Sequence, residues 1–318
     1  MLNVISWNID QYTQKKLNRE LTLHFKFKDN IYVIKENVMN YILGVLKGAD
    51  DFEPADIIII VELMGGTGGI GSNASSTATS SLSLLATGLN EDLGKTFDYQ
   101  VVSPLTIGNG EAMGVIYNAK KLTYKDKGVQ SLMGDTRAVF WSTFEPTAAS
   151  GINDKTNSLT VVGVHAPKPP KTLKTINYCQ ALNTVPQIKD VKTTDKQLGI
   201  VMGDFNISPT SNVSGKKPFA TLASLKYKTQ LTVKSKTTIK DPSTITSIDD
   251  YLGNPVDNLF MLAPSSVTNK TNVIDLIKDT IAVDTLNEVK LVVKQLRGTG
   301  TRFSAPVSDH LPVYATIS

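Results

Sequence analysis

The stretch Ile200-Val-Met-Gly-Asp-Phe-Asn206 restricts the fold of this chain most strongly. Its three apolar residues predict a buried strand, and Gly203 lets the backbone turn where that strand ends. Asp204 and Asn206 stand two residues apart, and residues at this spacing on an extended backbone share a face. A carboxylate beside a carboxamide suits the holding of a water or a metal-bound oxygen. Asp and Asn after Gly also commonly form a simple turn, so this stretch alone leaves both interpretations open.

The composition is ordinary for a globular protein. The chain has 318 residues, of which 41% are hydrophobic and 19% charged, so it can bury a large core. No apolar run approaches the roughly 20 residues that a membrane span requires. The chain begins almost directly on the strand-like segment Leu2–Trp7, which leaves no room for a signal peptide. We therefore expect a cytoplasmic protein, or a secreted one if a leader was removed.

The cysteine and histidine content limits the kind of metal site. The single cysteine, Cys179, excludes an internal disulfide framework and a cysteine-based zinc site. Three histidines are too few for a histidine-rich metal cage. Any metal should therefore be a hard cation with oxygen ligands. The net charge of +4 is compatible with a polyanionic partner, although charge alone is weak evidence for one.

Polar residues also follow other strand-like segments. Leu2–Ile5 leads to Asn8 and Asp10, a second polar pair two residues apart. The run from Asp56 to Glu62 is the most apolar in the chain, and its β-branched residues, 57 to 61, predict a strand covered on both faces. It ends on Glu62, a carboxylate that is costly to bury without a positive partner.

The same pattern recurs in the second half of the chain. The predicted strand Leu159–Val164 leads to His165, and the prolines that follow prevent the ladder from continuing. A structural histidine with satisfied hydrogen bonds is the alternative for His165. A predicted strand at Val256–Met261 carries Asp257, and Asp309-His310 precedes a final strand that ends at Ile317.

The remaining segments are predicted from their periodicity and turn residues. Helical spacing predicts Ile31–Lys47, Ser81–Leu93, Leu173–Val191 with a break at Pro186, and Asp284–Arg297 with Asp284 and Gly298 as caps. Residues 11–30 are expected to be irregular, and residues 207–250 to form loops around one short helix near Phe219–Leu225. The glycine-rich residues 65–80 lack the Gly-Lys-Ser/Thr of a phosphate loop, which favours a mobile loop beside the site over a nucleotide site. No repeat or linker divides the chain, which favours a single domain.

Together these motifs resemble the endonuclease/exonuclease/phosphatase superfamily, the fold of deoxyribonuclease I and exonuclease III. The residues that carry the resemblance are Trp7-Asn8-Ile9-Asp10, Glu62, His165, Gly203-Asp204-Phe205-Asn206, Asp257 and Ser308-Asp309-His310. The opening Ser-Trp-Asn-Ile-Asp looks most like the exonuclease III branch. The resemblance spans essentially the whole chain and implies an α/β (α+β) fold. The expected architecture is a four-layer sandwich of two packed mixed β-sheets flanked by helices, forming one catalytic domain over residues 1–318.

The resemblance also implies a divalent cation, usually Mg²⁺, with Mn²⁺ or Ca²⁺ as alternatives. Carried over residue by residue, Glu62 is the principal metal ligand, supported by Asp10, Asn8 and Asp309. All four offer hard oxygen ligands, which suits Mg²⁺. Asn8 is also a candidate contact to the substrate phosphate.

The catalytic roles that the resemblance implies fall on five residues. His165 and His310 contact the scissile phosphate and stabilise its developing charge. Asp204 positions or deprotonates the attacking water, and Asn206 holds that water or a phosphate oxygen in line. Asp257 supports one of the two histidines.

Two further positions match the family less closely. Arg137 stands where family nucleases place an arginine that grips substrate phosphate, and an ordinary surface arginine is the alternative. Glu111 resembles a carboxylate that pairs with the first catalytic histidine in the deoxyribonuclease I branch. Asn109 stands where that branch has a tyrosine, so kinship with that branch is in doubt.

The substrate is less restricted than the reaction. Lys168, Lys171 and Lys174 follow His165 and favour a nucleic-acid backbone. The leading hypothesis is a Mg²⁺-dependent phosphodiesterase, a nuclease that hydrolyses DNA by in-line attack of an activated water and acts as a monomer. The endonuclease and exonuclease modes both stay open. A phosphomonoesterase or a lipid-headgroup phosphodiesterase of the inositol phosphate or sphingomyelin type is the alternative, and a catalytically silent binding protein is the third hypothesis.

Overall fold

The computed structural model describes residues 1–27, 30–48, 53–132, 137–168, 172–231, 234–277, 285–297 and 307–318. Within these residues the strands form two six-stranded sheets and one two-stranded hairpin. The first sheet contains β1 (Leu2–Tyr12), β4 (Ile57–Met64), β5 (Tyr99–Gly108), β6 (Glu111–Asn118), β13 (Asn269–Val273) and β14 (Val313–Ile317). Its strand order is β13-β14-β1-β4-β6-β5.

The second sheet is built in the same way. It contains β7 (Leu122–Ser131), β8 (Ala138–Pro146), β9 (Ser158–His165), β10 (Gln197–Asp204), β11 (Lys228–Thr229) and β12 (Asp257–Leu262). Its strand order is β11-β12-β10-β9-β8-β7. Each sheet is mixed, because β1 pairs with β4 and β9 pairs with β10 in parallel, while the other pairs are antiparallel.

Strand β4 shows how the layers pack. Ile57, Ile59 and Val61 belong to the apolar core that also takes in side chains of the second sheet. Ile58 and Ile60 point the other way, into a core shared with α2 (Val38–Leu46) and α3 (Ser76–Leu93). Both faces of the strand are therefore covered, as its continuous β-branched run predicted.

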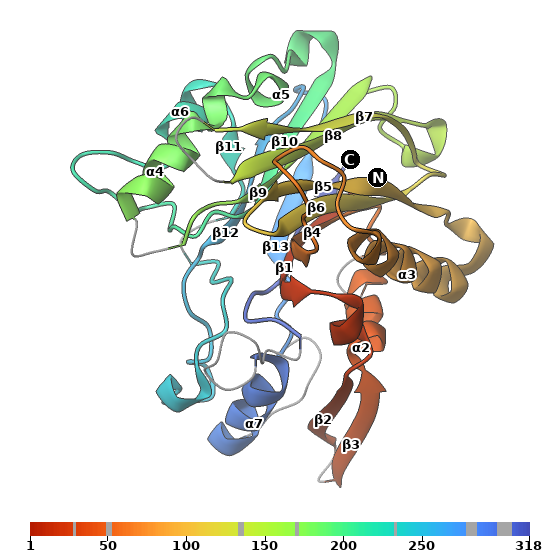
Figure 1. Cartoon of the computed structure of the whole chain (residues 1–318), viewed down its shortest axis with the longest axis vertical. Helices are drawn as coiled ribbons and strands as arrows, with labels where there is room; N and C mark the ends of the chain where they lie inside the picture. Colours follow the sequence, from red (N-terminus) through yellow and green to blue (C-terminus); the bar gives the residue numbers. More distant parts are fainter. Residues whose placement is uncertain are drawn as a thin grey trace.

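Helices close the sandwich on its other side. A third apolar core joins the outer face of β9 and β10 to α4 (Thr172–Ala181), α5 (Pro186–Lys189) and α6 (Ala220–Ser224). Figure 1 shows the two sheets stacked between these helices and α2 and α3. The predicted α/β sandwich of two mixed sheets flanked by helices is thus confirmed.

The N-terminal region differs from the prediction. Residues 11–30 are not irregular, because they include α1 (Gln14–Leu17) and β2 (Glu20–Phe27). The helix predicted over Ile31–Lys47 is wrong in its first half, where β3 (Asn30–Asn37) pairs antiparallel with β2. Asn37 ends that strand and caps α2, since its Oδ1 accepts a hydrogen bond from Asn40 N at 2.8 Å. The apolar spacing in this stretch fits either structure, and pairing with β2 selects the strand.

Other boundaries shift less. Pro186 does break the predicted helix, and it opens α5 at the first position, where proline is tolerated. The last predicted helix is present as α7 (Leu286–Arg297), while the predicted caps Asp284 and Gly298 lie outside the described residues. The polar edge strands β7 and β13 were not predicted, because neither has the apolar alternation of a half-buried strand.

In Figure 1, β2, β3 and α7 extend together from one end of the sandwich, and α7 contacts β2. No helix within the described ranges is long and apolar enough to span a membrane.

Candidate active site

The strand registers bring the predicted polar residues to one end of the sandwich. Asp204 stands opposite His165 in the parallel β9–β10 pair and opposite Asp257 in the antiparallel β10–β12 pair. In the other sheet, Asn8 on β1 pairs with the residue before Glu62 on β4. Because parallel strands end at the same edge of a sheet, each sheet presents its polar residues at one edge, and these two edges meet.

Asn8 joins the two sheets. Its Nδ2 donates to Asp204 Oδ2 at 3.1 Å and to Glu62 Oε1 at 3.3 Å. Asp204 is fully buried, and its two oxygens accept from Asn206 N at 2.7 Å and from Asn206 Nδ2 at 2.9 Å. Asn206 Nδ2 also donates to Ala166 O at 2.9 Å. The Asp204–Asn206 pair of the opening motif is therefore part of a polar cluster that joins the two sheets, and its role toward a water stays a prediction.

Glu62 reaches this cluster through an irregular backbone. The register of β4 shifts between Ile60 and Leu63, which is a bulge at Glu62. Glu62 has a φ of 61° and Gln11 a φ of 55°, both in the left-handed region that non-glycine residues rarely adopt. Gln11 N donates to Glu62 Oε2 at 3.4 Å. Such strain persists where the surrounding structure enforces it, and it is common at functional sites.

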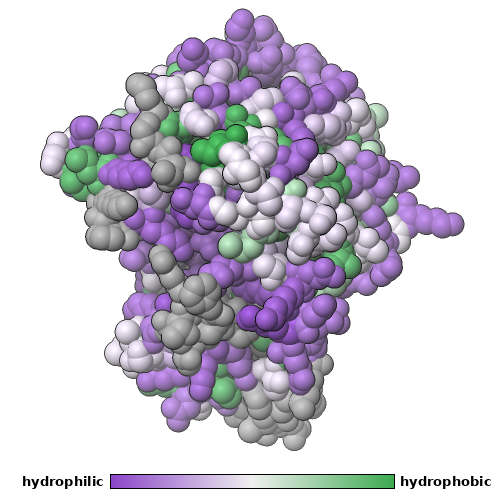
Figure 2. Space-filling view, viewed as in Figure 1, coloured by the Kyte–Doolittle hydropathy of each residue, from purple (hydrophilic) through white to green (hydrophobic). Residues whose placement is uncertain are grey.

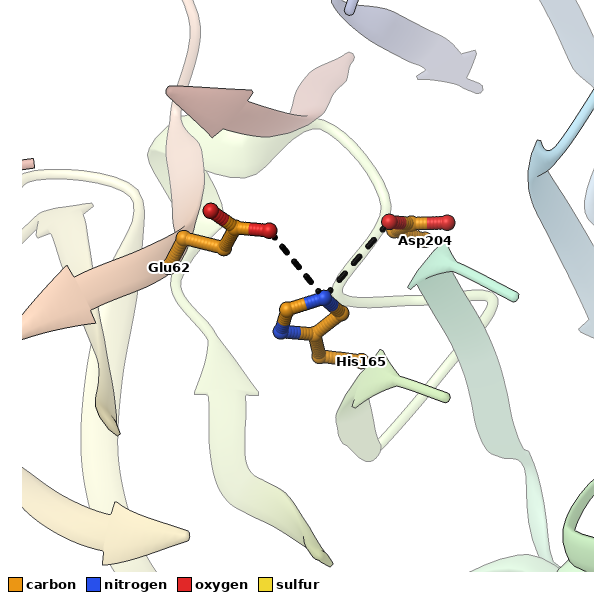
Figure 3. Close-up of side chains that lie close together, drawn as sticks. All are labelled: Glu62, His165 and Asp204. Atoms are coloured by element: carbon orange, nitrogen blue, oxygen red, sulfur yellow. Dashed lines mark ion pairs between the residues drawn. The ribbon is translucent and has the colours of Figure 1, made fainter. Parts of the chain in front are cut away.

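His165 lies between the carboxylates of Glu62 and Asp204 (Figure 3). Its Nε2 is 3.2 Å from Glu62 Oε1 and 3.6 Å from Asp204 Oδ2, while its Nδ1 is 2.7 Å from Glu111 Oε2. Burial alone would lower the pKa of His165, but the hydrogen bond and charge of Glu111, together with Glu62, raise it to about 9. Among the atoms that the structure describes, none completes a hydrogen bond with His165 Nε2. This buried N–H faces the acidic cluster and can donate to an incoming oxyanion.

Arg137 lies behind His165. Its Nη2 is 2.6 Å from Glu111 Oε1, and its Nη1 donates to Ala166 O at 2.9 Å. Arg137, Glu111 and His165 thus form a chain of contacts that ends in the site. Glu111 occupies the place beside the first histidine that the family resemblance implied. The structure gives Arg137 a carboxylate partner, and its predicted contact to substrate phosphate stays a prediction.

His310 repeats this arrangement on the other side of Asp204. Its Nδ1 is 2.8 Å from Asp257 Oδ2, and its Nε2 is 3.9 Å from Asp204 Oδ2. Burial opposes the charged form of His310, but Asp257 and Asp204 outweigh burial and hold its pKa well above the ordinary value. Burial raises the pKa of Asp257 to about 6, against the opposing effect of His310. Thr237 Oγ1 accepts from Asp257 N at 2.9 Å and so fixes the start of β12.

Asp10 and Asp309, the other two residues of the predicted metal set, are more exposed than Asn8 and Glu62. Burial raises the pKa of Asp10, and the charges of Glu62 and Asp309 add to the rise, so these three carboxylates share one region. Behind them the buried Lys16 donates through Nζ to Ile9 O at 3.1 Å and to Asp10 O at 2.5 Å. Burial lowers the pKa of Lys16 to about 8.

Comparison with known proteins rests on structure. No family model matches the chain, and no curated protein matches its sequence. The solved structures that are similar in fold over nearly the whole chain include TDP2 from D. rerio complexed with single strand DNA product, with 14% identity, a TM-score of 0.56, and 100% of this chain and 98% of that one covered. They also include an endonuclease/exonuclease/phosphatase from Bacteroides vulgatus, with 15% identity, a TM-score of 0.54, and 100% and 98% covered. A third is the human Nocturnin catalytic domain with bound sulfate anion, with 14% identity, a TM-score of 0.50, and 100% and 93% covered.

The chain has the endonuclease/exonuclease/phosphatase fold. This agrees with the resemblance carried by the strand-end motifs. At these identities the similarity establishes the fold, and the chemistry depends on the residues of this chain.

The donor set of this endonuclease/exonuclease/phosphatase fold suits a divalent cation. Within the described ranges, two trios of side chains have ligand atoms within 4.8 Å of one another: Glu62, His165 and Asp204, and Asp204, Asp257 and His310. Neither trio includes Asp10 or Asp309, so the predicted set of Glu62, Asp10, Asn8 and Asp309 stays a prediction. The oxygen donors of this predicted set are of the type that Mg²⁺, Mn²⁺ and Ca²⁺ bind. Glu62 already has a cation beside it, because Lys168 Nζ lies 3.1 Å from its Oε1.

Three contacts of the site were missed by the sequence analysis. The backbone N–H of Gln11, the ammonium of Lys168 on Glu62 and the ammonium of Lys16 behind Asp10 are all tertiary contacts. The sequence indicates Lys168 only as a contact to a nucleic-acid backbone, and its position three residues after His165 is the signal that places it near the site. Of the two lysines grouped with it, Lys171 lies outside the described residues.

The raised pKa of His165 predicts how stability depends on pH. A raised histidine pKa stabilises the fold fully below the ordinary value of 6.5, and this contribution is lost as pH rises through about 9. For the metal-free chain we expect His165 to contribute a loss of about 3 kcal/mol in unfolding free energy over this interval. Denaturant titrations of wild type and Glu111→Gln between pH 6 and pH 10 would measure it. The variant should show a flatter profile, and identical profiles would contradict the prediction.

Proposed function

We propose that this chain is a divalent-cation-dependent phosphodiesterase, and specifically a nuclease that hydrolyses phosphodiester bonds in DNA. The proposal treats residues 1–318 as one catalytic domain. The observation that carries it is the convergence of Asn8, Glu62, His165 and Asp204 within hydrogen-bond or ion-pair distance, from four strands in two sheets. Asn8 and Asp204, which are 196 positions apart in sequence, form a hydrogen bond there, and the carboxylate of Asp204 is fully buried. Isolated turns or caps would not produce such a cluster.

The two histidines suit an anionic transition state. Both Nε2 atoms lie within 4 Å of Asp204 Oδ2, at 3.6 Å for His165 and 3.9 Å for His310. Both pKa values are raised, which favours the charged form of both imidazoles in the metal-free chain. A phosphoryl group beside Asp204 would therefore receive two charged N–H donors as negative charge develops on its oxygens.

Asp204 is the residue that we assign to the attacking water. Asn206 and Asn8 hold its carboxylate in one orientation by the hydrogen bonds described above. A fixed carboxylate can accept the proton of a water and aim its lone pair at phosphorus. Glu62, Asp10, Asn8 and Asp309 would hold the cation, which supplies positive charge to the phosphate oxygens when bound.

Several observations favour a nucleic-acid substrate over the alternatives. The D. rerio TDP2 structure is complexed with single strand DNA product, and the human Nocturnin domain carries a sulfate, which has the charge and shape of a phosphate. The face seen in Figure 2 is largely hydrophilic, with apolar residues scattered in small groups, which suits a polar polyanion better than a lipid surface. A lipid-headgroup phosphodiesterase or a phosphomonoesterase stays the second candidate, because the same cluster suits any phosphate ester.

Metal removal tests this function. We expect supercoiled plasmid to be nicked in the presence of MgCl₂, and nicking to fall to background in EDTA and to return when Mg²⁺ is restored in excess, since an oxygen-ligated cation is bound reversibly. His165→Ala should stay at background under all three conditions. Gel electrophoresis of the plasmid over time is the measurement.

Two outcomes would redirect the assignment. Intact plasmid under all conditions would reject an endonuclease, and intact linear DNA as well would reject the nuclease. Assays with p-nitrophenyl phosphate, sphingomyelin and inositol phosphates would then test the second candidate. Absence of turnover on every substrate would leave the catalytically silent binding protein.

A further inference from the structure

Lys168 occupies an unusual place beside the candidate metal ligand. It follows His165 by three residues, on the segment that leaves β9, and its Nζ lies 3.1 Å from Glu62 Oε1. The side chain of Lys168 is 36% exposed, whereas that of Glu62 is 7% exposed. The pair therefore joins a partly exposed cation to a nearly buried carboxylate, which makes it different from an ordinary surface ion pair.

Glu62 Oε1 is crowded with nitrogen atoms. Asn8 Nδ2 lies at 3.3 Å, His165 Nε2 at 3.2 Å and Lys168 Nζ at 3.1 Å from this one oxygen. A divalent cation that binds Oε1 would meet the positive charges of both His165 and Lys168 at close range. Like charges at such distances repel strongly where water is partly excluded.

Only one of these two cations is free to leave. His165 is fully buried, and Glu111 holds its other ring nitrogen at 2.7 Å. Lys168 has a flexible four-carbon stem, and its side chain is partly exposed to solvent. Its charge also lies near Asp204 and Asp309, so it can move within the cluster without losing all of its acidic partners.

We propose that Lys168 is a tethered cation that neutralises Glu62 in the metal-free chain and must leave Glu62 Oε1 when a divalent cation binds. The displaced ammonium then contacts the phosphate of the substrate. Lys168 thereby sets the metal affinity of the site and contributes to substrate binding. This inference rests on the proposed function and adds to it a residue that competes with the metal.

The competition gives effects of opposite sign on metal and substrate binding. Removing the ammonium in Lys168→Met should tighten Mg²⁺ binding by about three- to tenfold, because the cation no longer has to displace a positive charge. The same variant should raise the KM for DNA and weaken its dependence on salt, because one phosphate contact is lost. A residue with a merely structural role would weaken both kinds of binding.

Isothermal titration calorimetry with MgCl₂ and no substrate measures the metal affinity directly. The proteins compared are wild type, Lys168→Met, Lys168→Arg and the matched control Lys125→Met. Lys125 forms an exposed ion pair with Glu145, with Nζ and Oε2 2.7 Å apart, and this pair does not involve the site residues. Lys168→Arg and Lys125→Met should keep the wild-type Kd. Thermal unfolding of the same proteins gives a second readout: Lys168→Met should have a lower Tm than wild type without Mg²⁺ and a larger rise in Tm with it.

The outcomes separate this inference from the proposed function. If wild type binds Mg²⁺ and Lys168→Met binds it with equal or lower affinity, the tethered-cation role is overturned while the metal site stands. If only Lys168→Met binds Mg²⁺, the role is supported. If neither protein binds Mg²⁺, Mn²⁺ or Ca²⁺, both the inference and the proposed metal site are overturned.

Discussion

Asp204→Asn is expected to lower the turnover of DNA cleavage by about 10²- to 10⁴-fold, the usual contribution of a positioned acid or base. The change keeps the size and shape of the side chain and removes its charge and its ability to take a proton. An amide oxygen at the Oδ2 position would still accept from Asn8 Nδ2 and Asn206 Nδ2, and only the bond from Asn206 N would be lost, so the folded structure should persist. Initial rates of nicking at saturating plasmid and Mg²⁺ measure the effect.

Asp92→Asn is the matched control. It makes the same chemical change in a carboxylate whose partner is the exposed Lys47, at 2.7 Å. Since exposed ion pairs contribute at most about 1 kcal/mol to stability, turnover should be unchanged. Turnover of Asp204→Asn within about threefold of wild type, below the range of acid–base effects, would show that Asp204 does not handle the attacking water.

Gly203→Ala should destabilise the fold by about 3 kcal/mol or more, because two penalties combine at this position. Gly203 has a φ of 138°, which side-chain-bearing residues rarely adopt. A Cβ built there would also collide with Val164 O and approach Val164 N to 3.0 Å, and both atoms belong to the backbone of the neighbouring strand β9. Neither strand can move without disturbing the register that aligns Asp204 with His165. Urea denaturation followed by circular dichroism measures the change.

Gly215→Ala separates the two penalties. Its φ of 77° is also positive, but a Cβ there meets nothing within 4 Å. We expect this variant to lose about 1 kcal/mol, from backbone strain alone. Equal losses in the two variants would mean that the collision with β9 is relieved at little cost and that the close approach at Gly203 does not determine stability.

The parts of the site that could be predicted from sequence are those that depend on local spacing. Asp204 and Asn206 follow an apolar run and a glycine, and Asn8 likewise follows a strand-like segment. These patterns fix which residues stand at strand ends, and the family resemblance fixes that the strand ends meet. The β-branched run of β4 similarly revealed its burial on both faces.

The parts that could not be predicted depend on contacts between distant segments. Nothing in the local sequence around Glu62 indicates its bulge, because the shifted register depends on the neighbouring β6 and β1. The contacts of Arg137 and Lys168 are also with distant segments of the chain. Their positive charge suggested a phosphate partner, whereas in the structure each lies beside a carboxylate, Glu111 for Arg137 and Glu62 for Lys168. The β2–β3 hairpin was missed for a related reason, since its apolar spacing is compatible with a helix until the partner strand is known.

The position of β14 between β1 and β13 makes completion of the candidate site depend on a long-range strand pairing. Trp7 Nε1 donates to His310 O at 3.0 Å, and β1 pairs along its first half with β14, so the first strand and the last are neighbours. A chain without residues 308–318 would have β1 as an unpaired edge and would lack His310. Pairing at such a large sequence separation forms late in folding. The candidate site is therefore complete only once β1 and β14 have paired.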